Sequence, residues 1–151
     1  MVKVAVTRGA LYIILNKLPM NPPDTQATVL LVDDDKDLLS LFAEALMPQF
    51  QSDRAQSAKE AEALMKLRKY KIVISDHNMP GGNGLNFLAR VRKQHPETVR
   101  VLLTSYMDPK LMAGVSEAEP YRYLLKPISI PDLLKAVRDA TKHHDEGRPT
   151  A

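Results

Sequence analysis

Apolar residues along this chain follow two alternating patterns, a short run and a helical spacing. The runs are short and mostly apolar, which is typical of buried strands. They predict strands over 28–32, 72–75, 99–103 and 121–125, with a weaker and more polar candidate over 49–55. After each strand, apolar residues recur every three or four positions, which predicts helices over 38–46, 58–67, 85–91, 109–117 and 131–140.

The strict alternation of strand and helix gives five βα units in a row. Consecutive parallel strands need a crossover connection, which is usually a helix. Strands that are covered on both faces read as nearly continuous apolar runs. The pattern therefore predicts an α/β fold with a doubly wound, five-stranded parallel sheet and helices on both faces.

The pattern also divides the 151 residues into three segments. Residues 27–142 carry the alternation and are expected to form one domain. The N-terminal extension, 1–26, is either a disordered or non-native leader with Met20 as the natural start, or an extra hairpin that pairs with a sheet edge; we favour the first. The C-terminal tail, 143–151, contains adjacent histidines beside Gly and Pro, and we expect it to be disordered.

Composition narrows the function classes. The chain has no cysteine, which excludes disulfides, thiolate zinc sites and cysteine nucleophiles and agrees with a cytoplasmic location. Its formal net charge is +3, and its basic residues are spread along the sequence. Without a basic cluster or a DNA-reading motif, direct binding to nucleic acid is not expected.

The first predicted strand ends in three consecutive aspartates. Asp35, together with Asp37, suits the start of the following helix, where acidic side chains are favourable. Asp33 and Asp34 lie at the strand tip, where neighbouring carboxylates repel each other unless a cation neutralises them. Carboxylate oxygens are ligands of Mg²⁺, so these two residues are candidates for a magnesium site.

Three other strands end in residues that can carry chemistry. The third delivers Asp76 onto a loop rich in proline and glycine, the fourth ends at Thr104, and the fifth ends at Lys126, which Pro127 follows. Each alone is most often a turn residue or a solvated side chain. In a doubly wound sheet, however, the carboxyl ends of these strands lie at one edge, where ligands bind. The sequence therefore predicts one pocket with three carboxylates, a hydroxyl and an ammonium group.

That set of groups fits phosphoryl transfer. A carboxylate can attack phosphorus and form an aspartyl phosphate. The transferred group needs its negative charge neutralised more than it needs acid–base chemistry. Mg²⁺ held by the three aspartates, with Lys126 and Thr104 as further contacts, would supply that neutralisation.

Four short motifs occur in this order: Val32-Asp33-Asp34-Asp35, Asp76-His77-Asn78-Met79-Pro80-Gly81, Leu103-Thr104-Ser105 and Lys126-Pro127. Their order and spacing resemble those of the receiver domain of response regulators in bacterial two-component signalling, over residues 28–142. The resemblance implies a (βα)₅ flavodoxin-like receiver fold. The implied roles are phosphoacceptor for Asp76, phosphate binding for Lys126, metal binding for Asp33, Asp34, Asp76 and the backbone carbonyl of Asn78, and switching for Thr104 and Tyr123.

The resemblance also implies a function and partners. The domain would be a phosphorylation-dependent signalling switch that catalyses only its own phosphotransfer and dephosphorylation. It would receive the phosphoryl group from a sensor histidine kinase or a phosphotransfer protein. It would act on an effector domain or protein through its fourth helix, fifth strand and fifth helix, with homodimerisation as a further option and no membrane partner. Residues 119–127 also resemble receivers attached to cyclic-dinucleotide phosphodiesterases, although no phosphodiesterase motif is present.

Two alternatives stay open. A degenerate receiver would act only as a docking module, which the intact set of residues disfavours. An aspartyl-phosphate phosphatase of the haloacid dehalogenase type would carry Asp-x-Asp-x-Thr on its first strand, and Asp33 to Asp37 lacks the threonine. Among the remaining residues, His77 stands where an apolar residue is more usual and is expected to be a tolerated neighbour. Tyr106 is expected to shield the acyl phosphate from water.

Overall fold

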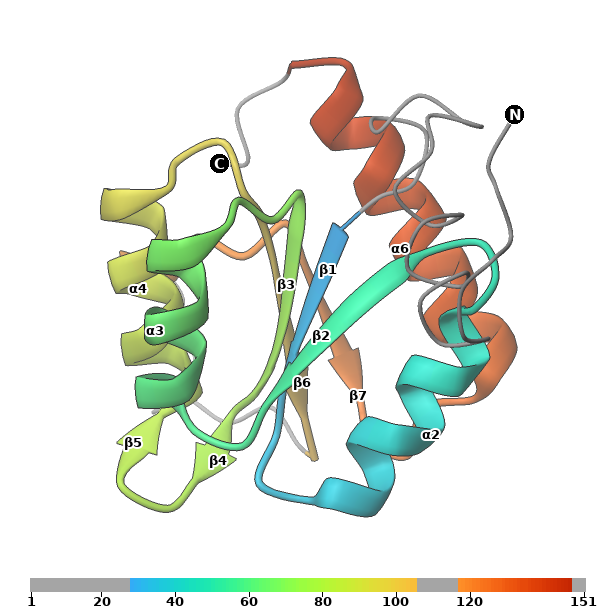
Figure 1. The fold of residues 1–151 in the computed structure, drawn as a ribbon, viewed down its shortest axis with the longest axis horizontal. Helices are drawn as coiled ribbons and strands as arrows, with labels where there is room; N and C mark the ends of the chain where they lie inside the picture. Colours follow the sequence, from blue (N-terminus) through green and yellow to red (C-terminus); the bar gives the residue numbers. More distant parts are fainter. Residues whose placement is uncertain (1–27, 106–116, 148–151) are drawn as a thin grey trace, which may run out of the picture.

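The computed structural model of this chain describes residues 28–105 and 117–147. In these residues a five-stranded sheet lies between two layers of helices (Figure 1). All neighbouring strands in the sheet are parallel, so the predicted doubly wound fold is confirmed. In spatial order the strands are β2 (Gln51–Ala55), β1 (Thr28–Val32), β3 (Ile72–Asp76), β6 (Val99–Thr104) and β7 (Arg122–Leu125).

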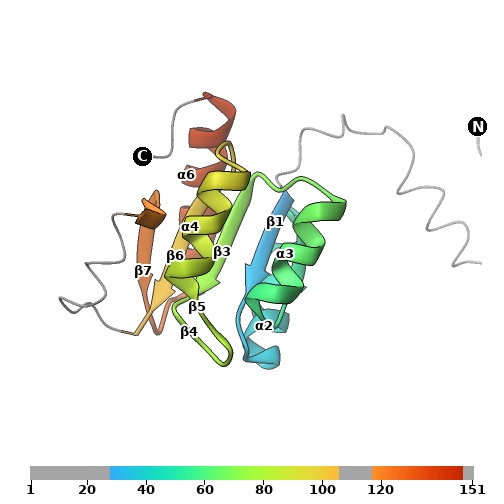
Figure 2. The same cartoon turned by 90° about the vertical axis from the view of Figure 1, so that its left-hand side faces the viewer.

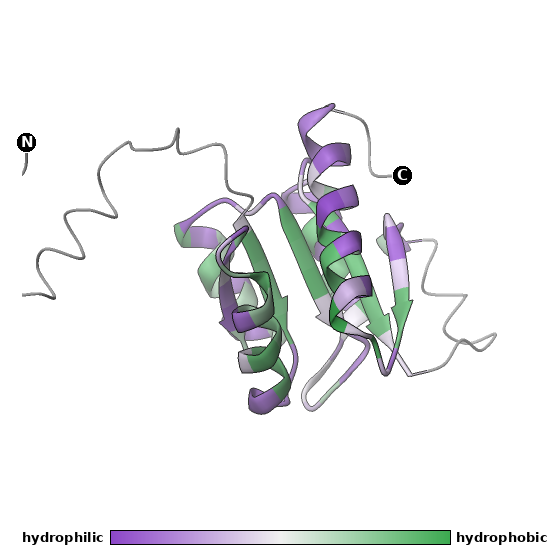
Figure 3. Ribbon diagram, turned by 90° about the vertical axis from the view of Figure 1, so that its right-hand side faces the viewer, coloured by the Kyte–Doolittle hydropathy of each residue, from purple (hydrophilic) through white to green (hydrophobic). Residues whose placement is uncertain are grey.

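The helices cover the two faces of the sheet in pairs. The pair α2 and α6 packs on one face, and the pair α3 and α4 packs on the other (Figures 1 and 2). Along β1, Val29 and Leu31 belong to the first core, whereas Leu30 and Val32 belong to the second. The central strands β1, β3 and β6 are mostly apolar, and the outward helix faces are polar (Figure 3), as burial of the central strands on both faces requires. The helices span α2 (Lys36–Leu46), α3 (Ala58–Leu67), α4 (Gly84–Gln94) and α6 (Ile130–Asp145).

Each of these helices begins at a polar cap residue. Asp35 caps α2 by accepting hydrogen bonds from the backbone N–H groups of Asp37 and Leu38, as expected for a helix start. Ser57 caps α3 and accepts from the N–H of Glu60 at 3.1 Å. The Glu60 carboxylate in turn accepts from the residue before the cap rather than from the cap itself, which differs from the usual capping box.

The loop after Asp76 folds back on itself, which the sequence pattern did not predict. Strands β4 (Asn78–Met79) and β5 (Gly82–Asn83) form a short antiparallel pair. Gly81 lies in the turn between them with a φ of 78°, a conformation that glycine adopts at little cost. The hairpin therefore returns the chain to the end of β3, where α4 starts.

The expected disorder of the C-terminal tail is wrong for His143 and His144, because α6 continues to Asp145. The last turn has tertiary partners: the His143 ring lies 4.4 Å from the ring of Tyr121, and Lys71 forms a 3.1 Å ion pair with Asp145. Most of the predicted 109–117 helix, Tyr106 and residues 1–26 lie outside the described residues. None of the helices in the described part of the chain has the length and apolarity that a membrane span requires.

Candidate functional site

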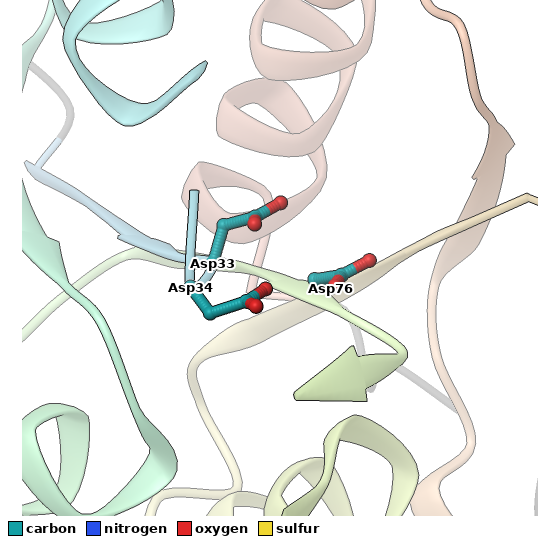
Figure 4. A group of neighbouring side chains, drawn as sticks. All are labelled: Asp33, Asp34 and Asp76. Carbon is teal, nitrogen blue, oxygen red and sulfur yellow. The ribbon is translucent and has the colours of Figure 1, made fainter. Parts of the chain in front are cut away.

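The predicted acidic residues meet at the carboxyl ends of β1 and β3. These two strands flank the point where the strand order reverses, which is where ligands bind in open α/β sheets. Carboxylate oxygens of Asp33, Asp34 and Asp76 lie within 4.8 Å of one another, and their side chains gather at this edge (Figure 4). Asp33 and Asp76 are buried, whereas Asp34 is exposed. The site is therefore a small acidic group that is open on one side.

Asp33 is fixed by hydrogen bonds on its backbone and on its side chain. Its backbone N–H donates to the carbonyl of Ala55 at 3.1 Å. Its Oδ1 accepts from the N–H of Asp35 at 2.9 Å, and its Oδ2 accepts from Nζ of Lys126 at 3.1 Å. The carboxylate therefore cannot rotate freely, and it presents a fixed charge to the site.

Lys126 brings a cation from the end of β7 to this acidic group. Its Nζ lies 2.9 Å from Oδ1 of Asp76 and 3.1 Å from Oδ2 of Asp33. Its backbone N–H donates to the carbonyl of Thr104 at 2.7 Å, and its peptide bond to Pro127 is cis. Burial alone would lower the pKa of Lys126, but hydrogen bonds and charges from Asp76 and Asp33 outweigh it and raise the pKa. The side chain is therefore an ammonium ion at neutral pH.

The surroundings of Asp76 disfavour the ionised form of its carboxyl group. Burial raises its pKa, and the nearby charges of Asp33 and Asp34 raise it further. The hydrogen bond from Lys126 opposes these effects, but the net shift is upward. A divalent cation at this position would relieve the repulsion among the three carboxylates.

We expect the Asp76→Asn variant to be more stable than the wild type at about pH 7 in the presence of a chelator. A carboxyl whose pKa is raised by folding stabilises the fold below its unfolded pKa, and this contribution is lost as the pH rises through the folded pKa. Asparagine does not titrate, so the advantage of the variant should shrink as the medium becomes acidic. Thermal unfolding across the acidic and neutral range measures this, and a difference that is constant with pH would contradict it.

The acidic group has the donors that a hard cation requires. Mg²⁺ takes oxygen ligands and commonly binds proteins through one or two carboxylates while keeping several waters. Each of the three aspartates offers one oxygen within 4.8 Å of the others, so the donor set fits this ion. Asn78 lies at the start of β4, on the loop that follows Asp76 and outside the group of three carboxylates.

The two expected switch residues lie on the neighbouring strands. Thr104 is the last residue of β6 and is buried, one position beyond Leu103, which is in register with Asp76. Tyr123 lies on β7, in register with Leu102 of β6. It is 42% exposed, so its ring is accessible to solvent. The structure thus separates a buried hydroxyl near the acidic group from a half-exposed aromatic ring beside it.

Sequence reasoning missed the part that Gly84 plays in shaping this site. Its N–H donates to the carbonyl of His77 at 2.9 Å. A Cβ placed on Gly84 would lie 1.9 Å from the backbone oxygen of Asp76 and 3.0 Å from Cα of His77. The backbone at the start of α4 therefore lies directly against the backbone of Asp76 and His77. The available signal was a glycine immediately after Asn83, which is a typical helix cap.

Comparison with known proteins decides the family. A family model described as the response regulator receiver domain matches residues 29–138 of the chain. The chain belongs to this family. As a receiver domain it is a module of phosphorylation-dependent signalling in two-component systems, and the family generally binds Mg²⁺ at an acidic pocket. The resemblance predicted from the four motifs is confirmed.

The receiver domain is similar to part of several curated transcriptional regulatory proteins. It is 38% identical over 120 residues to the hydrogenase transcriptional regulatory protein HoxA of Cupriavidus necator, which covers 79% of this chain and 25% of that protein. The chain thus spans about a quarter of the length of the curated relatives it matches.

Solved structures support the same assignment. The receiver domain of an HD domain-containing protein from Pseudomonas fluorescens is 35% identical, with a TM-score of 0.78 over 87% of this chain and 98% of that one. The chemotaxis response regulator CheY4 of Vibrio cholerae is 28% identical, with a TM-score of 0.71 over 77% of this chain and 99% of that one. Response regulators act with histidine kinases and with downstream effector domains, so the described residues correspond to the input module of such a system.

Proposed function

We propose that this receiver domain accepts a phosphoryl group on Asp76 from a histidine kinase or a phosphotransfer protein. The observation that carries the proposal is the position of Nζ of Lys126, 2.9 Å from Asp76 and 3.1 Å from Asp33 beside a third carboxylate. A strand-end aspartate without these neighbours would be a turn residue. With these neighbours, Asp76 is a nucleophile whose carboxylate already contacts the ammonium group of Lys126.

The chemistry is a displacement at phosphorus. A carboxylate oxygen of Asp76 attacks the phosphorus of a phosphohistidine, the P–N bond breaks, and its electron pair leaves on the imidazole. The product is a mixed anhydride that carries up to two negative charges in place of one. Lys126 neutralises part of this charge without moving, because its ammonium group already contacts the attacking carboxylate. Mg²⁺ held by Asp33, Asp34, Asp76 and the carbonyl of Asn78 would neutralise the rest when bound.

The same event changes the surface of the domain. Thr104 would donate a hydrogen bond to the phosphoryl oxygens, and Tyr123 would turn inward from its exposed position. A tenfold shift between two conformations needs only about 1.4 kcal/mol of differential interaction. One charge-assisted hydrogen bond to the phosphoryl group is enough to supply it.

The remaining expectations from the sequence belong to the same proposal. We assign the receiver domain to residues 27–142, with 1–26 as an extension and the residues after 142 as a tail whose first part prolongs α6. The domain would act on no separate substrate and would signal to an effector domain or protein. Relatives named as transcriptional regulators and a receiver from an HD domain-containing protein support a separate output part. A cytoplasmic location and the absence of direct nucleic-acid or membrane binding stay predictions.

Incubation with acetyl phosphate and Mg²⁺ tests the assignment of the acceptor. Intact-mass measurement should show a gain of about 80 Da, one phosphoryl group, in the wild type and none in Asp76→Asn. Asp35→Asn is the matched control, because Asp35 is a nearby carboxylate that caps α2, and asparagine caps helices equally well. This control should be modified like the wild type.

The other outcomes of this experiment are equally informative. A mass gain that persists in Asp76→Asn would move the acceptor to another residue. A wild-type chain that stays unmodified, although folded, would favour the docking module instead. Either result would remove Asp76 from the proposed role.

A further inference from the structure

Arg100 is a charged side chain buried near the start of the apolar strand β6. It is 1% exposed and stands between Val99 and Val101 on β6. Its Nε donates to the carbonyl of Ala118 at 2.8 Å, and its Nη2 donates to the carbonyl of Glu119 at 2.9 Å. Its Nη1 donates to the carbonyl of Thr98 at 3.3 Å. A buried cation is costly unless its donors are satisfied, and the two shorter of these three hydrogen bonds go to a single short piece of backbone.

A second arginine binds the same piece of chain from α4. Nη1 of Arg92 donates to the carbonyl of Glu117 at 3.1 Å, and Nη2 lies 2.9 Å from the carboxylate of Glu119. We call Arg92, Arg100 and the backbone of residues 117–119 the arginine clasp. Glu119 has a φ of 42°, which L residues rarely adopt, and both arginines contact it.

Holding the buried charge of Arg100 close to the charge of Arg92 costs electrostatic free energy. Burial lowers the pKa of Arg100 to about 10, and the positive charge of Arg92 adds to this effect while Glu119 opposes it. Arg100 nevertheless stays protonated at neutral pH. Two like charges brought this close need a reason beyond local packing, since an apolar side chain at position 100 would match the rest of β6.

The arginine clasp is connected to the phosphorylation site by two elements. Arg100 and Thr104 are four positions apart on β6, so their side chains point to the same face of the sheet. Helix α4 starts at Gly84, which lies against the backbone of Asp76, and carries Arg92 in its last turn. Both elements begin or end at the acidic group and reach the clasp at their other end.

The arginine clasp also fixes the start of β7. The chain leaves the site at Ser105 and re-enters the described structure at Glu117, where the clasp holds it immediately before β7. The N–H of Tyr121 then donates to the carbonyl of Arg100 at 2.8 Å. At its other end, β7 leads to Lys126 in the acidic group. Tyr123 therefore lies between two anchored points.

We propose that the arginine clasp is a positioning device that couples phosphorylation of Asp76 to the exposed face of β7. This inference rests on the proposed function. Thr104 lies beside the end of β7, because its carbonyl accepts a hydrogen bond from the N–H of Lys126 at 2.7 Å. A strand that is anchored at its start must therefore change conformation around Tyr123 when Thr104 turns toward the phosphoryl group. Without the anchor, residues 117–121 absorb the movement, and the phosphoryl group is accepted with little effect on the surface.

The test follows Tyr123 in the full chain labelled with 3-fluorotyrosine, its ¹⁹F resonance assigned with Tyr123→Phe. Acetyl phosphate and Mg²⁺ are added, and intact mass is measured on the same samples. We expect the rate of mass gain in Arg92→Met and Arg100→Met to stay within about twofold of wild type, whereas the phosphorylation-induced shift of Tyr123 falls below about half. Arg100→Lys, which keeps the charge, should restore part of the shift.

Arg90→Met is the matched control, because Arg90 lies on the same helix and pairs with Glu62 instead of residues 117–119. It should lose a surface ion pair and keep the full shift of Tyr123. A merely structural role for the arginine clasp would lower the melting temperature of the clasp variants and leave the shift intact.

The outcomes distinguish failure of the coupling from failure of the proposed phosphorylation of Asp76. If wild type is phosphorylated and the Tyr123 shift is absent from it, or is undiminished in both clasp variants, the coupling is wrong and the phosphoacceptor stands. If wild type is not phosphorylated, the proposed function fails and the coupling fails with it. Should Arg100→Met not fold, the half-exposed Arg92 still decides, because its removal leaves the buried strand unchanged.

Discussion

Replacing Gly84 with alanine should abolish phosphorylation of Asp76 and lower the free energy of unfolding by about 3 kcal/mol. The added Cβ would lie 1.9 Å from the Asp76 oxygen and 2.9 Å from its carbonyl carbon. Both atoms are backbone, so no side-chain rotation can make room. Either α4 must shift away from the sheet or the backbone of Asp76 and His77 must move, and we expect both changes to displace the Asp76 carboxylate from Lys126.

Gly82→Ala is the control for this experiment. Gly82 lies on the same loop, its nearest neighbour to a new Cβ is Ala58 at 3.9 Å, and its φ is not in the left-handed region. We expect this variant to keep its stability within about 0.5 kcal/mol and to be phosphorylated normally. Chemical denaturation and the mass assay measure both effects. Equal behaviour of the two variants would show that the contact at Gly84 has no consequence.

Lys126→Met should slow phosphorylation by at least about tenfold, because the charge that develops on the phosphoryl oxygens loses its fixed cation. The same change leaves Asp33 and Asp76 buried beside each other without their ammonium partner. We therefore expect the free energy of unfolding at neutral pH to fall by about 2 kcal/mol when no divalent cation is present. Denaturation curves and the rate of mass gain measure the two effects.

The loss of stability in Lys126→Met should depend on pH and on Mg²⁺ in a defined direction. The pKa of Asp76 is raised by burial, so this carboxyl loses its charge as the pH falls, and the difference in stability from wild type should narrow. Mg²⁺ should narrow it at neutral pH, since it supplies the missing positive charge. Lys135→Met is the control, because Lys135 is an exposed lysine on α6 whose ion pair is with Asp139. If the difference in the free energy of unfolding between Lys126→Met and wild type changed neither with pH nor with Mg²⁺, the loss of the lysine charge would not be the cause of the destabilisation.

The fold was predictable because local and global signals agree. The apolar runs at 28–32, 72–75 and 99–103 match β1, β3 and β6 to within one residue at each end. The polar strand predicted over 49–55 is shorter in the structure, where β2 begins at Gln51. This strand lies at the edge of the sheet with one neighbouring strand, so its apolar pattern is weak and its start was hard to predict. The convergence of Asp33, Asp34, Asp76 and Lys126 followed from topology, since the carboxyl ends of these parallel strands share one edge.

The features that escaped prediction depend on contacts between distant segments. Arg100 reads in the sequence as one polar residue in an apolar strand, and only the folded chain shows carbonyl groups 18 and 19 positions away that satisfy it. Gly84 reads as an unfavourable first residue of a helix until the Asp76 backbone is seen against it. Periodicity describes one element at a time, so it cannot reveal close approach between two.

The tail shows the opposite error, in which composition outweighed a local signal. His143 and His144 stand before a glycine, and that glycine, Gly147, has a φ of 66°. A glycine in this conformation typically follows the end of a helix. Gly147 therefore indicated a helix end near residue 146, later than the end at 140 that the apolar pattern predicted. The contacts of the last turn with Tyr121 and Lys71 then stabilise residues that look like a solvated tail in isolation.

The cation in the acidic group, Lys126, comes 93 residues after Asp33 and directly follows β7, the last strand in the sequence. During synthesis, Asp33, Asp34 and Asp76 therefore leave the ribosome well before the lysine that balances them. A chain interrupted before β7 would hold three mutually repelling carboxylates and no ammonium group. If Asp76 is the phosphoacceptor, as proposed, a chain that has not yet completed the sheet would lack the lysine that the reaction uses, and we expect it not to be phosphorylated.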